Sequence, residues 1–528
     1  MFDLLIINGK IIDGTSNPWF YGDIAVKDGK IIQVGFIKEK KAKRIIDVSG
    51  LFVCPGFIDI HSHSDLEPMA NYRCESKVRQ GVTTEVVGNC GDSAAPVFGQ
   101  AYEDQKKATE EYELKLTWQI VAQYLDALQN SKPSINYAML IGHGTIRKSV
   151  MGYDNRKPTA DELEKMKELV KQAMEEGAFG ISTGLLYPPG SFADVEEIIE
   201  LCKVVAKYGG YYATHMRSEG DWLEQSVAET IEIGKQANIS VQISHHKAFG
   251  KQNYGKVEKT LRMIEQARKN GIDVTCDVYP YTATSTSLAS ILPSWVHEGG
   301  KEKMLERLKN NEIRRKIAEQ IDPVQRRISG YENLYISYVS SDKNKWCEGK
   351  SVQQIAHQLN KEPIDVVLDL IIEEKAHVGM IRFAMDEEDV KKVISSPYSM
   401  IGSDGSALAP YGILSKGHPH PRNYGTFPRV LARYVRELEV ISLEEAIRKM
   451  TSFPAQRLGL SDRGLIKPNM AADIVVFDFD KVKDTATHEE PKRYPEGIEY
   501  VIVNGVITVE KGEHTDARVG KVLRKNSN

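Results

Sequence analysis

The most informative stretch of this chain is Leu51-Phe52-Val53-Cys54-Pro55-Gly56-Phe57-Ile58-Asp59-Ile60-His61-Ser62-His63. Its apolar run predicts a buried strand. Residues two apart on a strand point to the same face, so His61 and His63 are directed at one point, with Asp59 one step below them. Two convergent imidazoles at the end of a strand form a ready site for a divalent metal ion. The structural alternative, two hydrogen-bonded polar residues at a strand terminus, is weakened by similar side chains at the ends of other predicted strands.

Strands and helices alternate through the middle of the chain, which predicts a parallel α/β arrangement. Eight strand–helix units form a TIM-type (β/α)8 barrel. The interval from about 281 to 398 is too long for a single connection. We therefore expect an inserted lid over the mouth of the barrel, within about 281–345. The eight core strands are predicted at 57–63, 83–90, 135–142, 179–185, 211–216, 240–246, 273–280 and 399–404.

Both ends of the chain carry short alternating strands with turn signals such as Asn8-Gly9 and Asn504-Gly505. Two β-rich termini around one large middle predict a small β-sandwich that both ends build. We divide the 528 residues into an N-terminal part of the β-sandwich (1–55), a catalytic barrel with the lid (56–465) and a C-terminal part of the β-sandwich (466–528). The length suits a large barrel with an accessory domain.

The composition is that of an ordinary soluble enzyme, with 41% hydrophobic and 27% charged residues. The net charge of −4 gives no basic field for nucleic acid or an anionic membrane. No apolar stretch approaches the length of a membrane span, and the N-terminus does not resemble a signal peptide. The six cysteines form no C-x-x-C pair, which indicates a reducing cytoplasm.

Side chains that bind metal ions stand at the ends of several predicted strands. Because the carboxyl ends of all barrel strands share one rim, where active sites form, residues far apart in sequence meet there. Histidine, cysteine and aspartate together suit zinc or a similar transition ion. On a regular strand only one of two adjacent histidines faces the lumen, and the alternation with Ile243 favours His245. His246 is then a packing or supporting residue, and His143 stays unassigned. In strand order the set is His61, His63, Cys90, His215, His245, His246 and Asp404.

This pattern resembles the amidohydrolase superfamily of metal-dependent barrel hydrolases, and within it the D-aminoacylase family of N-acyl-D-amino-acid deacylases. The superfamily is marked by the opening 55–63 and by Ala472-Asp473-Ile474-Val475-Val476-Phe477. The resemblance covers nearly the whole chain. The narrower family is marked by Gly88-Asn89-Cys90-Gly91, Ser244-His245-His246-Lys247, Asp277-Val278-Tyr279-Pro280-Tyr281, and His418-Pro419-His420-Pro421-Arg422 followed by 425–429.

The resemblance implies two metal positions. The tight zinc site is Cys90, His215 and His245, and a second, weaker position is His61, His63 and Asp404. Many superfamily members bridge two metals with a carboxylated lysine from the fourth strand. The fourth strand of this chain, within 178–185, has no lysine, and Cys90 supplies the unusual ligand instead. A thiolate also favours zinc over magnesium.

The implied activity is zinc-dependent hydrolysis of the amide bond of N-acyl-D-amino acids to a carboxylate and a free D-amino acid. Asp404 is the expected general base, which takes a proton from metal-activated water and passes it to the leaving amine. Arg422 is expected to grip the substrate carboxylate bidentately. Tyr279 is a candidate second contact to that carboxylate. Lys247 shares the face of His245 and either meets the substrate's side chain or acyl group or is structural.

Two alternatives to this activity are open from the sequence. A cyclic-amide hydrolase of the hydantoinase or dihydropyrimidinase type shares the barrel and the His-x-His motif, but generally uses the lysine that is missing here. A non-catalytic protein on the same fold is the other, because a fold does not by itself imply a function. The expected partner is a small N-acylated amino acid, with no nucleic acid or membrane, and the oligomeric state is open.

Overall fold

A closed barrel of parallel strands forms the centre of the computed structural model, which describes residues 1–525. Only Leu140 separates β8 from β9, and a parallel bridge from Ser62 to Gly405 joins the first strand to the last. The TIM-type barrel is therefore confirmed, with a strand inside each of the eight predicted ranges or overlapping it. In order around the barrel these are β6 (Phe57–Asp59), β7 (Val82–Val87), β8 (Asn136–Met139) with β9 (Ile141–Gly142), β10 (Gly180–Gly184), β11 (Tyr211–His215), β12 (Ser240–Ile243), β13 (Val274–Val278) and β17 (Ser399–Ile401).

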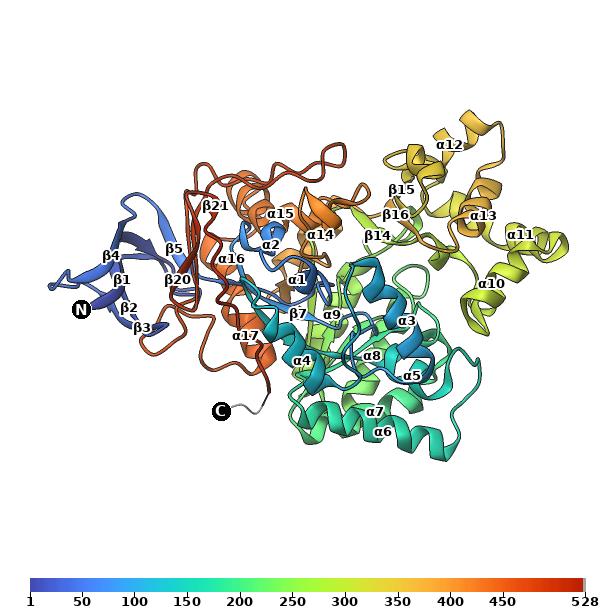
Figure 1. Ribbon diagram of the computed structural model, residues 1–528, viewed down its shortest axis with the longest axis horizontal. Coiled ribbons are helices and arrows are strands. Elements are labelled where there is room, and N and C mark those ends of the chain that lie inside the picture. The colour runs from blue at the N-terminus through green and yellow to red at the C-terminus, as the bar shows by residue number, and fades with distance from the viewer. Residues whose placement is uncertain (526–528) are drawn as a thin grey trace.

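Amphipathic helices cover the outside of the barrel (Figure 1). They include α6 (Ala160–Glu175), α7 (Val195–Lys207), α8 (Leu223–Ala237) and α9 (Lys256–Lys269). Helix α6 begins after Thr159, which forms a capping box with Glu162 that satisfies free backbone donors of the first turn. None of the helices within residues 1–525 has the length and hydropathy needed to cross a bilayer.

Strands from both ends of the chain form one accessory sheet (Figure 1). Strand β5 lies at its junction, because it pairs in parallel with β1 and antiparallel with β18. Only Gly56 separates β5 from β6, so this sheet holds the first barrel strand at its base. The nine strands are β1 (Phe2–Ile11), β2 (Phe20–Lys27), β3 (Lys30–Gly35), β4 (Ala42–Asp47), β5 (Phe52–Pro55), β18 (Ile474–Phe477), β19 (Ile498–Val503), β20 (Val506–Glu510) and β21 (Glu513–His514).

An insertion with its own hydrophobic cluster separates β13 from β17. Its antiparallel sheet has the order β14-β16-β15, and the helices α10 to α13 pack around it at one end of the molecule (Figure 1). We expected a lid that ended near 345, but the sheet reaches Phe383, because β14 closes on β16. The elements are β14 (Ala283–Ser287), α10 (Gly300–Lys309), α11 (Asn311–Ile328), β15 (Leu334–Val339), α12 (Val352–Leu359), α13 (Pro363–Glu373) and β16 (Val378–Phe383).

Candidate metal centre

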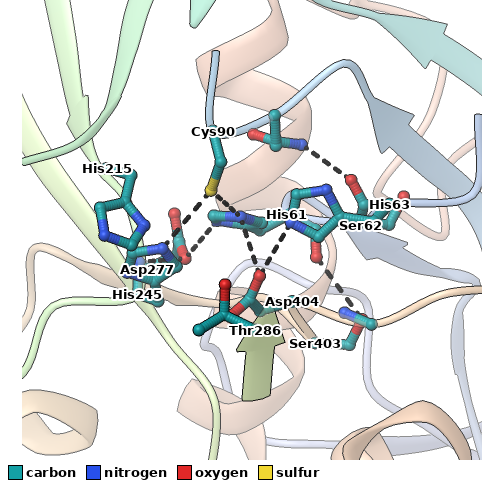
Figure 2. A network of polar contacts seen from close by, with 12 residues as sticks. His61, Ser62, His63, Cys90, His215, His245, Asp277, Thr286, Ser403 and Asp404 are labelled. Atoms are coloured by element: carbon teal, nitrogen blue, oxygen red, sulfur yellow. Dashed lines mark hydrogen bonds and ion pairs between the residues drawn. The ribbon is translucent and has the colours of Figure 1, made fainter. Parts of the chain in front are cut away.

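Side chains at or just after the ends of β6, β7, β11, β12 and β17 converge at the mouth of the barrel, as Figure 2 shows. The Cys90 Sγ lies 3.3 Å from His61 Nε2 and 3.5 Å from His245 Nε2. The Asp404 Oδ1 lies 2.9 Å from His63 Nε2 and 3.3 Å from His61 Nε2. Four potential ligand atoms lie within 4.8 Å of one another, one each from His61, Cys90, His245 and Asp404. The structure thus brings the predicted residues of both metal positions into a single cluster.

His215 completes this cluster from the end of β11. Its ring centroid is 4.5 Å from that of His245. Both of its ring nitrogens are buried, and neither has a hydrogen-bond partner among residues 1–525. A buried polar group without a partner is costly, so an ion that these nitrogens could ligate would account for their arrangement. Tetrahedral ligands at zinc distances lie about 3.3–3.8 Å apart, which the Cys90 distances match.

Three of the clustered side chains extend from left-handed backbone. The φ angles are 53° at Cys90, 35° at His245 and 51° at Asp404. Such angles are uncommon outside glycine and gather at functional sites. Strand β12 ends at Ile243, so simple strand alternation does not position His245, although His245 is the histidine of the pair that lies in the cluster. These residues lie in the tight turns that follow the strands.

Glycines make room for the turn that presents Cys90. A Cβ on Gly91 would lie 2.4 Å from the Gly184 nitrogen, and one on Gly184 would lie 2.0 Å from the Cys90 oxygen. Real side chains do not approach backbone this closely, so the end of β10 must be glycine where the cysteine turn packs on it. Strand β10 reads Gly-Ile-Ser-Thr-Gly and carries no lysine. The turn that carries the Cys90 thiol therefore packs directly on the end of a strand that has no lysine.

The charges of the cluster favour the ionised forms of its thiol and carboxylate. Burial would raise the pKa of Cys90, but His61 and His245 outweigh it and hold that pKa well below its ordinary value. Burial would also raise the pKa of Asp404, and Arg422 leads the groups that hold it well below its ordinary value. A thiolate and a carboxylate beside several imidazoles are the donor set of a transition-metal site.

Two carboxylates that the sequence reasoning missed orient the histidines. Asp277 Oδ1 lies 3.1 Å from His61 Nδ1 and accepts a hydrogen bond from the His245 backbone nitrogen at 2.7 Å. Glu219 Oε1 lies 2.8 Å from His245 Nδ1. Carboxylates on the far nitrogen of a ligating histidine fix its orientation and raise its basicity. Both had a signal in the sequence, since Asp277 opens one of the family motifs and Glu219 comes four residues after His215.

Arg422 contacts the proposed base from the first turn of α15 (Arg422–Arg429). Its Nη1 lies 2.7 Å from Asp404 Oδ2, and its Nη2 donates to the Ser285 carbonyl at 3.2 Å. The Nη1 contact is an ion pair by distance but lacks hydrogen-bond geometry. The buried Nε and Nη1 therefore have no hydrogen-bond partner within residues 1–525. The Arg422 guanidinium also lies over the Tyr279 ring, 5.0 Å from its centroid.

The other two candidate substrate contacts are engaged with protein groups. Lys247 Nζ donates to Glu219 Oε1 at 2.5 Å and lies 2.8 Å from His245 Nδ1. The Tyr279 hydroxyl donates to the Met385 sulfur at 3.8 Å. Both residues still line the central cavity, so each could meet a ligand only along the part of its side chain that faces that space.

His143 and His246 lie outside the cluster. His143 Nε2 is 2.8 Å from Glu197, and His246 Nε2 is 2.8 Å from the Thr260 hydroxyl. Burial lowers the pKa of His246 to about 4. Neither residue lines the cavity. We therefore regard both histidines as groups that pack and support the barrel.

A cavity of about 760 Å³ lies over the cluster. Its wall includes Cys90, His215, Asp404 and Arg422, and the insertion contributes Met380 among others. This size is suited to a small organic ligand. The arrangement can bind a metal ion, hold a carboxylate at Arg422 and move a proton at Asp404.

Comparison with known proteins agrees with this chemistry. The amidohydrolase family profile matches residues 44–509. The chain is 36% identical over 532 residues to D-aminoacylase of Alcaligenes xylosoxydans xylosoxydans, covering 100% of this chain and 98% of the relative. The crystal structure of N-acyl-D-glutamate deacylase from Bordetella bronchiseptica, complexed with zinc and a phosphonate mimic of the tetrahedral intermediate, superposes with a TM-score of 0.84 at 35% identity and 99% coverage of each chain.

A D-aminoacylase crystal structure gives a TM-score of 0.84 at 37% identity, covering 99% of this chain and 100% of that one. A D-hydantoinase structure is much more distant, with 16% identity and a TM-score of 0.56, and shows a shared fold alone. The cyclic-amide alternative therefore has no support beyond the barrel. Across almost its whole length, this chain belongs to the amidohydrolase family.

Proposed function

We propose that this enzyme is a zinc-dependent N-acyl-D-amino-acid deacylase, which hydrolyses the amide to a carboxylate and a free D-amino acid. The observation that carries the proposal is the 2.7 Å contact between Arg422 and Asp404 on the wall of the cavity that also contains Cys90, His215 and His245. In an N-acyl amino acid a single carbon separates the free carboxylate from the scissile amide. A carboxylate anchor must therefore lie next to the groups that cleave the bond.

Arg422 is suited to be that anchor. Its buried Nε and Nη1 donors have no hydrogen-bond partner among the described residues 1–525, and a guanidinium binds a carboxylate through two parallel hydrogen bonds. Hydantoins and dihydropyrimidines have no free carboxylate beside the amide, so such an anchor would have no role in their hydrolysis. The preference for the D-form rests on the similarity to D-aminoacylase and to N-acyl-D-glutamate deacylase.

The residues fit zinc, with Cys90, His215 and His245 as the tight site and His61, His63 and Asp404 as a second position. When bound, zinc supplies a Lewis acid that polarises a carbonyl and makes water a better nucleophile at neutral pH. Asp404 is held ionised by Arg422, so its carboxylate can take a proton from the attacking water and deliver it to the leaving nitrogen. Arg422 thus orients both the substrate and the base.

The direct test is amine release from N-acetyl-D- and N-acetyl-L-amino acids by the zinc-loaded protein. Release that depends on the D-form supports the proposal, and none across a broad panel rejects it. Metal analysis should give about one tightly held zinc per chain. We expect Cys90→Ala to lose that zinc and Asp404→Ala to retain it without turnover, whereas a near-normal rate in Asp404→Ala would contradict the assignment of the base.

All six cysteines of the chain are free, which supports a cytoplasmic location.

A further inference from the structure

One cationic side chain in the cavity wall has no acidic partner among the described residues 1–525. Six lysine and arginine residues line the cavity, and five of them have a carboxylate within ion-pair distance. Arg382 has none within residues 1–525. The paired residues, with their partners and distances, are Lys148 (Asp104, 3.3 Å), Arg217 (Glu229, 2.9 Å), Lys247 (Glu219, 2.5 Å), Arg327 (Asp221, 2.5 Å) and Arg422 (Asp404, 2.7 Å).

Within residues 1–525, the Arg382 guanidinium hydrogen-bonds only to neutral groups. Its Nε donates to the Ser329 hydroxyl at 3.0 Å, its Nη2 donates to the Gln325 carbonyl at 2.8 Å, and its Nη1 donates to the Gln325 side-chain oxygen. These bonds attach β16 to the last turn of α11. They use three of the five N–H donors of a guanidinium and leave one on each terminal nitrogen.

The burial of Arg382 makes the missing counter-charge significant. The residue is 1% exposed, and burial lowers its pKa to about 10 despite the nearby Tyr331 and Glu332. It therefore remains charged near neutral pH. A buried charge without an opposite charge is costly, and its contacts to α11 could be made by a neutral side chain. An anionic group on a bound ligand would supply the partner that the protein lacks.

The register of the insertion's sheet places Arg382 opposite Thr284, two residues along β14 from Thr286. Thr284 pairs with Arg382 and Thr286 with Met380, so the four share one face, and all four line the cavity. The Thr286 hydroxyl is 3.1 Å from that of Tyr187, whose ring centroid is 4.8 Å from that of His215. Figure 2 draws Thr286 together with the residues of the centre. Residues two apart on a strand lie about 7 Å apart, so Thr284, the partner of Arg382, lies about that far along β14 from Thr286.

We propose that Arg382 binds a second carboxylate of the substrate, which makes acidic N-acyl-D-amino acids the preferred class. The inference rests on the proposed deacylase function and adds its specificity. Arg422 holds the carboxylate beside the amide, and Arg382 holds the one that extends toward the insertion. The second carboxylate belongs either to the amino-acid side chain or to a dicarboxylic acyl group, and the two sources can be distinguished with isosteric substrates.

The experiment compares kcat/KM for pairs that differ only in charge. For the side-chain source the pair is N-acetyl-D-glutamate and N-acetyl-D-glutamine. For the acyl source it is N-succinyl-D-glutamine and N-succinamoyl-D-glutamine. We expect at least about a tenfold preference for the charged member of one pair, as one charge-assisted hydrogen bond provides. Ratios of one or below in both pairs overturn the inference.

Variants locate the preference in Arg382. Arg382→Met should reduce the ratio to near one while it retains activity on N-acetyl-D-glutamine. Arg327→Met is the matched control, because this cavity arginine is already paired with Asp221, and it should keep the ratio. An Arg382→Met enzyme with the wild-type ratio overturns the inference, and if this variant does not fold, the wild-type ratios decide. Activity on neutral D-substrates with no charge preference rejects this inference alone, whereas no activity on any D-substrate rejects the proposed function.

Discussion

Replacement of Arg422 by methionine tests the carboxylate anchor. The change removes the Nε and Nη1 donors, which have no hydrogen-bond partner within residues 1–525, but keeps an apolar stem of similar length. Two charge-assisted hydrogen bonds at about 1.5–3 kcal/mol each give about 3–6 kcal/mol. At 1.36 kcal/mol per tenfold in rate, we expect kcat/KM for N-acyl-D-amino acids to fall by about 10² to 10⁴.

The assay compares each acid with its α-carboxamide analogue, which offers Arg422 no ion pair. Wild-type enzyme should prefer the acid strongly, and Arg422→Met should hydrolyse the two at similar, low rates. The variant should retain its zinc, because Arg422 is not a proposed ligand. A loss of less than about tenfold for the acid, or equal losses for acid and carboxamide, would refute the reasoning.

Three further predictions concern the support of the site and the fold. Gly184→Ala pushes a Cβ to within 2.0 Å of the Cys90 carbonyl, so zinc affinity measured by competition with a chelator should fall about tenfold or more. Gly271→Ala is a control for backbone strain without a clash, because Gly271 has a φ of 83° and its added Cβ would meet no atom within 4 Å, and it should leave zinc affinity unchanged. In the wild type, the Lys77 Nζ lies 2.9 Å from the Asp59 carboxylate and 3.2 Å from that of Glu85, both fully buried. Lys77→Met leaves both carboxylates without their cation and should lower the free energy of unfolding, measured with denaturant, by about 3–5 kcal/mol. Hydrogen bonds to the Glu374 carboxylate outweigh burial and lower its pKa to about 2. The stability that Glu374 contributes is therefore fully present above the pKa of the unfolded chain and is lost as the pH falls toward 2. The difference in unfolding free energy between wild type and Glu374→Gln should shrink as the pH is lowered from the unfolded pKa toward 2.

The sequence was sufficient to predict the barrel and the convergence of the site. Alternation of strand and helix predicted eight strands, and shared barrel geometry implied that Cys90, His215 and Asp404 meet although they lie far apart in the chain. These inferences depend on periodicity and topology, which are local or follow from the fold. The positive φ angles that direct Cys90 and Asp404 into the cluster are not visible in a pattern of residue types.

The remaining features depend on contacts that no spacing predicts. Glu219 and Asp277 orient the histidines through hydrogen bonds between separate strands, so only the folded chain shows their partners. Lys247 was expected either to meet the substrate or to be structural; it donates to Glu219 and also lines the cavity, so both roles remain predictions. The insertion reaches Phe383 because its first and last strands pair across about a hundred residues, a long-range contact beyond the range of local patterns.

X-ray absorption at the zinc edge of the purified enzyme tests whether Cys90, His215 and His245 bind one zinc ion, because it counts the sulfur ligands of the bound ion. With Cys90, His215 and His245 around one zinc, the wild type should show one sulfur at about 2.3 Å together with nitrogen or oxygen ligands at about 2.0–2.2 Å. Cys90→Ser should lose the sulfur contribution. A wild-type spectrum with nitrogen and oxygen ligands only would contradict the account.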